Sequence, residues 1–169
     1  MQNQTITQET AALEQVIRQV INSWAAQNKS VTTFFNKYDE AAYMQEVAPG
    51  RNRAIYLLGH LLAANDGMLP LFGLGEKLYP EFYAQFQIAP DKSVETLPSV
   101  AELKQQWETV MATLADHFQK MTTQDWLGKH NSISAEDFER EPHRNKLNVL
   151  LGRTNHQSYH LGQLNLLSV

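Results

Sequence analysis

The sequence predicts an all-α protein, a four-helix bundle whose second and third helices are joined by a long crossover. Apolar residues recur at spacings of three and four in four segments of roughly 20 residues each, the period of an α-helix. No segment alternates apolar and polar residues for long enough to indicate a β-sheet. The proline-containing connection over residues 73–98 is long enough to return the chain along the bundle. We therefore expect the second and third helices to be parallel.

The first two long helices are expected over about residues 8–28 and 51–72. In the first, apolar residues every three or four positions define one face. A short helix is expected near residues 39–47, and the proline and glycine at 49–50 then interrupt the chain. In the second long helix, a histidine, His60, falls inside the apolar stripe.

The third and fourth helices have clearer signals. Ser99 and Glu102 form a capping-box pattern at the start of the third helix, which then shows a heptad-like apolar seam. The fourth helix is expected over about residues 145–167. One of its faces combines three aliphatic residues with two histidines: Val149, His156, His160, Leu164 and Leu167. Gly59 and Gly152 have no side chains and would allow neighbouring helices to approach closely, although packing alone also explains them.

Composition excludes several classes of protein. A chain of 169 residues is expected to form one domain, covering residues 1–169. A net charge of −4 with scattered Lys and Arg argues against a nucleic-acid partner. No apolar run approaches the ~18 residues of a membrane span, and the first residues lack a secretion signal, so we expect a cytoplasmic protein without a membrane partner. The absence of cysteine excludes disulfides, cysteine-bound metals and a cysteine nucleophile.

The histidines indicate a metal site. His156 and His160, four residues apart, project from the same side of a helix and can bind one divalent ion together. The spacing alone equally fits two histidines at the surface or with other partners. However, all three of His60, His156 and His160 interrupt apolar faces, and a buried imidazole needs a partner. One shared ion would satisfy all three rings. Because ligation needs neutral imidazole, metal affinity is expected to fall as the pH drops through about 6.

Five other residues could bear on this site. His117, near the end of the third helix, is expected to be a packing or boundary residue rather than a fourth ligand. His130 and His143 lie in polar stretches and are expected to be in solvent. Tyr56 either lines the pocket or packs in the core with its hydroxyl at the rim. Gln163 either holds a ligand ring or a bound water, or makes a hydrogen bond between helices.

The order of these motifs resembles the DinB/YfiT-like superfamily of metal-binding four-helix bundles. The motifs are VAPGRN at 47–52, LLGHLL at 57–62 and NHQSYHLGQL at 155–164, and the resemblance covers nearly the whole chain. It implies an up-down-down-up bundle and no polymerase activity. It also implies that His60, His156 and His160 hold a divalent ion, commonly zinc or nickel.

The function expected from this site is metal-dependent chemistry on a small molecule. Three histidine ligands leave coordination positions open, as in catalytic zinc sites. Some relatives use low-molecular-weight thiols, so the resemblance implies a metal-dependent thiol S-transferase or a related hydrolase or isomerase. Because the chain has no cysteine, the thiol would come from a cosubstrate. The alternatives are a non-enzymatic stress protein that binds a metal or small molecule, and a metal-free helical interaction module. The sequence identifies no catalytic residue.

A symmetric homodimer is also expected. The first and third helices are rich in aromatic and other apolar residues, including Trp24, Trp107 and Phe118. Some of these side chains would remain available to contact a second copy. Homodimers also occur among similar proteins.

Overall fold

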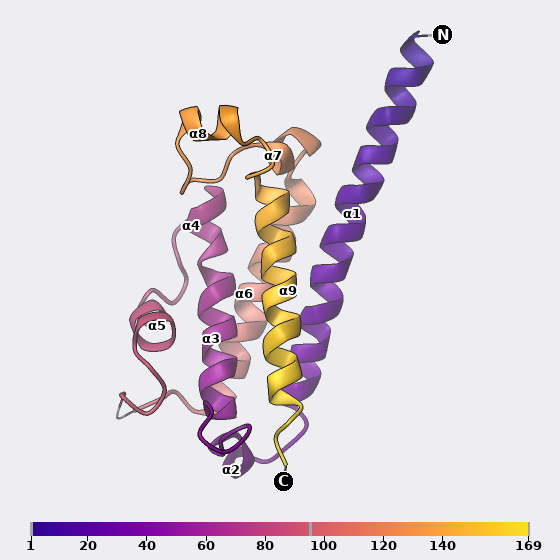
Figure 1. Ribbon diagram of the computed structural model, residues 1–169. Coiled ribbons are helices and arrows are strands. Elements are labelled where there is room, and N and C mark those ends of the chain that lie inside the picture. The colour runs from indigo at the N-terminus through magenta and orange to yellow at the C-terminus, as the bar shows by residue number, and fades with distance from the viewer. Residues whose placement is uncertain (1, 95, 169) are drawn as a thin grey trace.

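The computed structural model describes residues 2–94 and 96–168, and the side chains of residues 8–94 and 96–168. Four long helices lie side by side (Figure 1): α1 (Gln2–Phe35), α3 (Ala54–Asp66), α6 (Val100–Lys120) and α9 (Lys146–Leu164). In Figure 1, α1 and α9 run down the view, whereas α3 and α6 run up it. Both α1 and α3 pack against α6 and α9.

The prediction of an all-α protein is confirmed for the described residues. They contain no strand, and only two isolated β-bridges occur among them. The connections between the long helices contain shorter ones: α2 (Glu40–Tyr43), α4 (Met68–Phe72), α5 (Glu81–Tyr83), the π-helix η1 (Ala84–Ile88), α7 (Thr123–Leu127) and α8 (Ala135–Arg140). The chain therefore has more helices than the four that apolar periodicity predicted.

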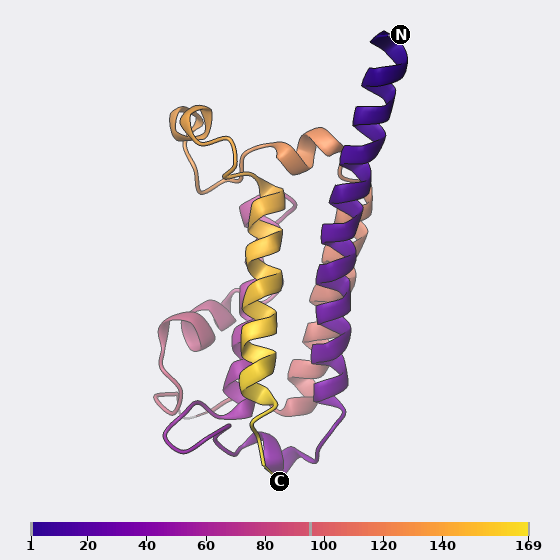
Figure 2. The ribbon, with the colours of Figure 1, turned by 45° about the vertical axis from the view of Figure 1, so that its right-hand side comes forward.

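Two helices differ from the prediction in where they begin or end. The helix expected over 51–72 is divided into α3 and α4 at Gly67. Pro70 explains the break, because it has no N–H to donate to the carbonyl of Asp66 and its ring crowds that group. α1 is longer than residues 8–28 at both ends, and its first turns extend beyond the other long helices (Figure 2).

The starts of α6 and α9 are fixed by side-chain caps. The predicted capping box of α6 is present in both directions: the Ser99 hydroxyl accepts from the Glu102 N–H, and the Glu102 carboxylate accepts from the Ser99 N–H. At α9, the Asn145 side chain accepts from the backbone N–H of Asn148 at 2.9 Å. This cap fixes the start of the helix that carries two of the three histidines.

The aromatic residues expected to contact a second copy are instead buried within the chain. Trp24, Trp107 and Phe118 are 2%, 0% and 2% exposed. The indole N–H of Trp24 donates to the Asn65 side chain at 3.2 Å, and that of Trp107 donates to the Thr32 hydroxyl at 3.0 Å. These three side chains are therefore not available for a partner. The homodimer itself stays a prediction.

One stretch of the described residues, Ala54–Phe72, is long and apolar enough to cross a membrane by length and composition. This differs from the expectation that no such run exists. The stretch has a mean hydropathy of 1.2, and 78% of it is buried inside the protein. That burial is typical of a core helix, because its apolar side chains already face other parts of the chain.

The long connection from α4 to α6 is anchored against α3. At one end, the backbone N–H of Arg53 donates to the Asp91 carboxylate at 2.7 Å, and the two side chains form an ion pair. The Asp91 side chain is only 3% exposed. Further along α3, the Phe86 ring of η1 lies so close to Gly59 that a Cβ there would be 2.3 Å from the ring. Only glycine fits this position, so Gly59 permits the contact between η1 and α3.

Gly152 behaves differently from Gly59. Nothing lies within 4 Å of where its Cβ would be. The expectation that Gly152 allows a close helix approach was therefore wrong, and the expectation for Gly59 is met by η1 rather than by a long helix.

The two glycines form a matched test of this packing. Gly59→Ala should destabilise the fold, because overpacking costs ~1–3 kcal/mol while the gain in helix propensity is only ~1 kcal/mol. Gly152→Ala should leave the free energy of unfolding unchanged or raise it by up to ~1 kcal/mol. Urea denaturation of both variants measures the difference. Equal stabilities would contradict the close contact at Gly59.

Candidate metal centre

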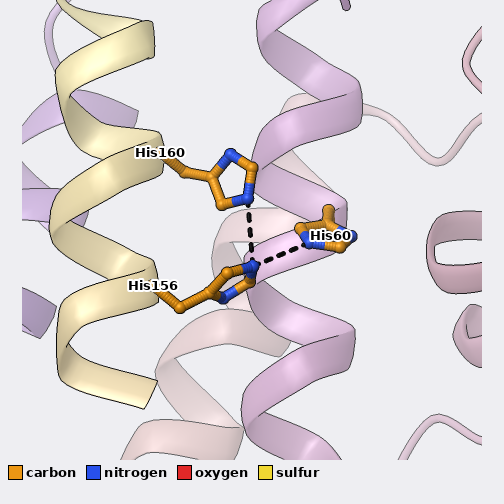
Figure 3. A group of neighbouring side chains, drawn as sticks. All are labelled: His60, His156 and His160. Carbon is orange, nitrogen blue, oxygen red and sulfur yellow. Dashed lines mark hydrogen bonds between the residues drawn. The ribbon is translucent and has the colours of Figure 1, made fainter. Parts of the chain in front are cut away.

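Three histidine rings converge between α3 and α9 (Figure 3). His60 comes from α3, and His156 and His160 come from successive turns of α9. The Nε2 atoms of His60 and His160 each lie 3.0 Å from the Nε2 atom of His156. One nitrogen from each ring lies within 4.8 Å of the others. The structure thus brings together the three residues that the sequence singled out.

Hydrogen bonds to the Nδ1 atoms of two rings determine whether their Nε2 atoms present a lone pair or a hydrogen to the centre of the cluster. The Nδ1 atom of His60 is 2.7 Å from the Phe86 carbonyl oxygen, and that of His160 is 2.8 Å from the Gln163 side-chain oxygen. These oxygen atoms can only accept, so each ring donates from Nδ1. In a neutral ring, Nε2 then carries a lone pair. Both lone pairs are directed at His156.

The Phe86 carbonyl is free to accept from His60 because of a proline. In an α-helix it would accept from the N–H of residue 90, but Pro90 has none. The segment instead forms the π-helix η1, in which the Ala89 N–H donates to the Ala84 carbonyl. A second link holds η1 in place, since the Gln87 side chain donates to the His60 carbonyl at 2.9 Å.

The donor set fits a divalent cation. A hydrogen on His156 Nε2 could be donated to His60 or to His160 but not to both, which would leave one lone pair facing another. A cation accepts all three lone pairs at once. The nitrogen atoms of a tetrahedral zinc site lie roughly 3.3 Å apart, close to the 3.0 Å found here. The Nδ1 atom of His156 is buried without a partner among the described residues, so this ring is the least fixed of the three.

Burial keeps the three rings neutral. It is the main cause of a lowered pKa for His60, His156 and His160. The effect is largest for His156, whose pKa falls to about 4 because His160, His60 and Arg153 also oppose a positive charge there. Neutral imidazole is the form that binds metals. The lowered pKa values therefore favour the neutral form of these rings in weakly acidic solution.

A cavity of about 330 Å³ has lining residues one helical turn from His60 on α3 and from His156 on α9, although none of the three histidines lines it. Arg153, one turn before His156 on α9, contributes to its wall. The Nε atom of this guanidinium is buried and has no hydrogen-bond partner among the described residues. Burial also lowers the pKa of Arg153, as expected for a cation removed from water.

Comparison with protein families identifies the relatives of this chain. The model of the DinB superfamily matches residues 23–164. The chain belongs to the DinB superfamily. The DinB match includes the whole of α3 and α9, which carry the three histidines. It also includes Phe86 and Gln163, whose oxygen atoms accept hydrogen bonds from two of the rings. A search of curated proteins found no match.

The remaining histidines of this DinB-superfamily chain lie outside the cluster. His117 is half-buried in the last turn of α6, in agreement with a packing or boundary residue. His143 is exposed, as expected. His130 was expected in solvent but is half-buried, and its Nδ1 atom accepts from the Ser132 N–H at 3.2 Å.

The contacts of Tyr56 and Gln163 distinguish between the two roles considered for each residue. Tyr56 is 8% exposed and packs in the core, and its hydroxyl donates to the Ala89 carbonyl at 2.7 Å. Its ring is also stacked against the ring of His60, with the two ring centroids 6.5 Å apart. Gln163 accepts from a histidine of its own helix, so it orients a ring of the cluster.

Sequence reasoning missed two contributors to the site. The Phe86 carbonyl is a backbone group, so no residue type could have indicated it; Pro90 four residues later was the only trace. Arg153 could have been found, because it lies three residues before His156 and projects from the same side of the helix.

The lowered pKa values predict how the metal-free protein responds to acid. Below about pH 6.5 the unfolded chain takes up protons on these histidines while the folded chain does not. The free energy of unfolding should therefore fall as the pH drops from about 6.5 toward 4. Urea denaturation in the presence of a chelator measures this dependence.

Two substitutions, one in the cluster and one control at the surface, test this explanation. His156→Gln should reduce the dependence between pH 6.5 and 5, because it removes the ring with the lowest pKa. His143→Gln changes an exposed histidine and should leave it as in the natural chain. A natural chain whose stability is constant over this range would contradict the burial of neutral rings.

Proposed function

We propose that this protein binds one divalent metal ion through His60, His156 and His160 and uses it in chemistry on a small molecule. One observation carries the proposal: two rings of fixed tautomer direct their Nε2 lone pairs at the Nε2 atom of a third, 3.0 Å away. Among the candidate ions, zinc and nickel suit imidazole ligands.

Each protein group has a separate role in this proposal. His60, His156 and His160 hold the ion, while the Phe86 carbonyl and Gln163 fix the orientation of two of the rings. Such orienting hydrogen bonds also raise the basicity of the ligand nitrogen. A divalent ion held by three neutral imidazoles supplies Lewis acidity, which favours the deprotonated form of a thiol or water bound to it.

The reaction class we propose is transfer to or from a low-molecular-weight thiol. The adjoining cavity of about 330 Å³ supports a small-molecule substrate, and the lack of cysteine requires the thiol to come from outside. The alternative is a non-enzymatic binding protein. One observation favours it: no Asp or Glu lines the cavity, so the described residues provide no carboxylate base there.

We extend the proposal to the rest of the molecule. The helix directions in Figure 1 support an up-down-down-up bundle of α1, α3, α6 and α9, with the shorter helices as its connections and residues 1–169 as one domain. A cytoplasmic homodimer remains our proposal for location and assembly. Light scattering at micromolar concentration tests the dimer, and a monomer would remove it.

Single substitutions should rank in a fixed order for metal binding. His60→Ala removes a ligand and should weaken Zn²⁺ binding more than Gln163→Ala, which removes only an orienting hydrogen bond and should cost roughly 10–100-fold. His143→Ala, at an exposed position, should bind as the natural chain does. Calorimetric titration and metal analysis after dialysis measure these affinities. Unchanged binding by His60→Ala would refute the site.

An activity panel separates the enzyme from the binding protein. Low-molecular-weight thiols are combined with electrophiles, with metal-loaded and metal-free protein. We expect adduct formation that needs the metal and is lost in His60→Ala but kept in His143→Ala. Metal binding without turnover across the panel would favour the non-enzymatic alternative.

A further inference from the structure

The cavity lies toward the same end of the bundle from the three histidines, whether it is followed along α3 or along α9. On α3, Ala63, Ala64 and Gly67 line it, one to two turns after His60. On α9, Arg153 lines it, one turn before His156. Because α3 and α9 run in opposite directions (Figure 1), both paths lead to the same side of the cluster. None of the three histidines lines the cavity, and Ala63 and Arg153 place its wall one helical turn from His60 and His156.

The cavity wall is positively charged. Its lining includes two cationic side chains, Arg153 and Lys77, and no Asp or Glu. Amide and hydroxyl side chains complete the polar part of the wall: Tyr83, Gln87, Asn131 and Ser132. This part is fixed in place, because the Asn131 side chain donates to the Pro70 carbonyl at 2.8 Å and its N–H donates to the Leu71 carbonyl. The Lys77 ammonium lies over the Tyr83 ring, 4.0 Å from its centroid. The charge of the wall suits an anion.

Arg153 is the group in this wall that most needs a partner. Its buried Nε atom has no hydrogen-bond partner, and no carboxylate within the described residues forms an ion pair with it. Arg153 is half-buried, and a cation in that setting without a counter-charge is unfavourable, since its buried part loses water and gains no partner. The planar guanidinium presents several donors in a geometry that matches carboxylates and phosphates. A bound oxyanion would satisfy it.

We propose that this cavity binds the oxyanion group, a carboxylate or phosphate, of a small-molecule ligand, with Arg153 as the main contact and Lys77 as a second. The volume of about 330 Å³ lies at the small end of ligand sites, which indicates a compact molecule. The inference rests on the proposed function in one respect: the other end of the ligand reacts at the histidines. The oxyanion site itself needs no metal.

The test uses metal-free full-length protein and three probes. Succinate and inorganic phosphate are compared with neutral succinamide at constant ionic strength, and binding is followed by NMR titration. We expect succinate or phosphate to bind and succinamide not to. The better of the two identifies the oxyanion. Equal binding of succinamide, or no binding of any probe, would overturn the proposal.

Substitutions assign the binding to Arg153. Arg153→Met should weaken oxyanion binding about tenfold to a hundredfold, as expected for loss of charge-assisted hydrogen bonds. It should not lower the melting temperature, because the Nε atom it removes has no partner to lose. Arg18→Met, an exposed arginine on α1, makes the same change of charge elsewhere and should bind as the natural chain. Unchanged binding by Arg153→Met would overturn the proposal.

Lys77→Met is the second variant, and it lies in a connection rather than in a long helix. It should weaken binding several-fold and keeps the test valid if Arg153→Met does not fold. In that case, unchanged binding by Lys77→Met would count against the proposal. Cobalt uptake is measured in parallel. Oxyanion binding without cobalt uptake would refute the proposed function but not this inference. Cobalt uptake without oxyanion binding would refute this inference but not the proposed function.

Discussion

The hydrogen bond from His60 to the Phe86 carbonyl is the contact on which the rest of the site depends. It fixes the tautomer of His60, and so decides that a lone pair rather than an N–H faces His156. The bond exists because Pro90 removes the usual helical donor to that carbonyl and because Gly59 lets η1 approach α3. The ion pair of Arg53 with Asp91 then holds the end of the connection. A connection between helices thus acts as part of the binding site.

This arrangement trades stability for readiness to bind. Three half-buried imidazoles occupy positions where aliphatic side chains would pack, and burial opposes their protonation. The buried Nδ1 atom of His156 and the Nε atom of Arg153 lack partners among the described residues. Unsatisfied groups of this kind lower stability. The side-chain oxygen atoms of Gln106 and Gln157 also lack partners among the described residues, so such groups are not confined to the cluster and its cavity. The Trp24 and Trp107 indole N–H groups in the core have partners.

Much of this could be predicted from the sequence, for physical reasons that also explain the failures. Apolar periodicity and the Ser99 cap identified the long helices, and the interruption of apolar faces identified the three histidines. α2 lies within the short helix expected near residues 39–47. Most of the other short helices were missed, because segments of three to six residues contain too few turns to show a period. The break at Gly67 was overlooked although Pro70 indicated it. Pairing of His60 with a backbone carbonyl depends on tertiary packing, which local sequence does not encode.

The placement of the ligands along the chain has a consequence for the order of events during synthesis. His60 and His156 are 96 positions apart, and the two histidines of α9 belong to the last long helix. Because chains emerge from the ribosome N-terminal end first, His60 appears long before its partners. One imidazole does not retain an ion, so the growing chain has no competent site. For the metal site proposed above, selection of the ion would therefore be deferred until α9 has docked, when the completed fold rather than the nascent polypeptide sets the competition among ions.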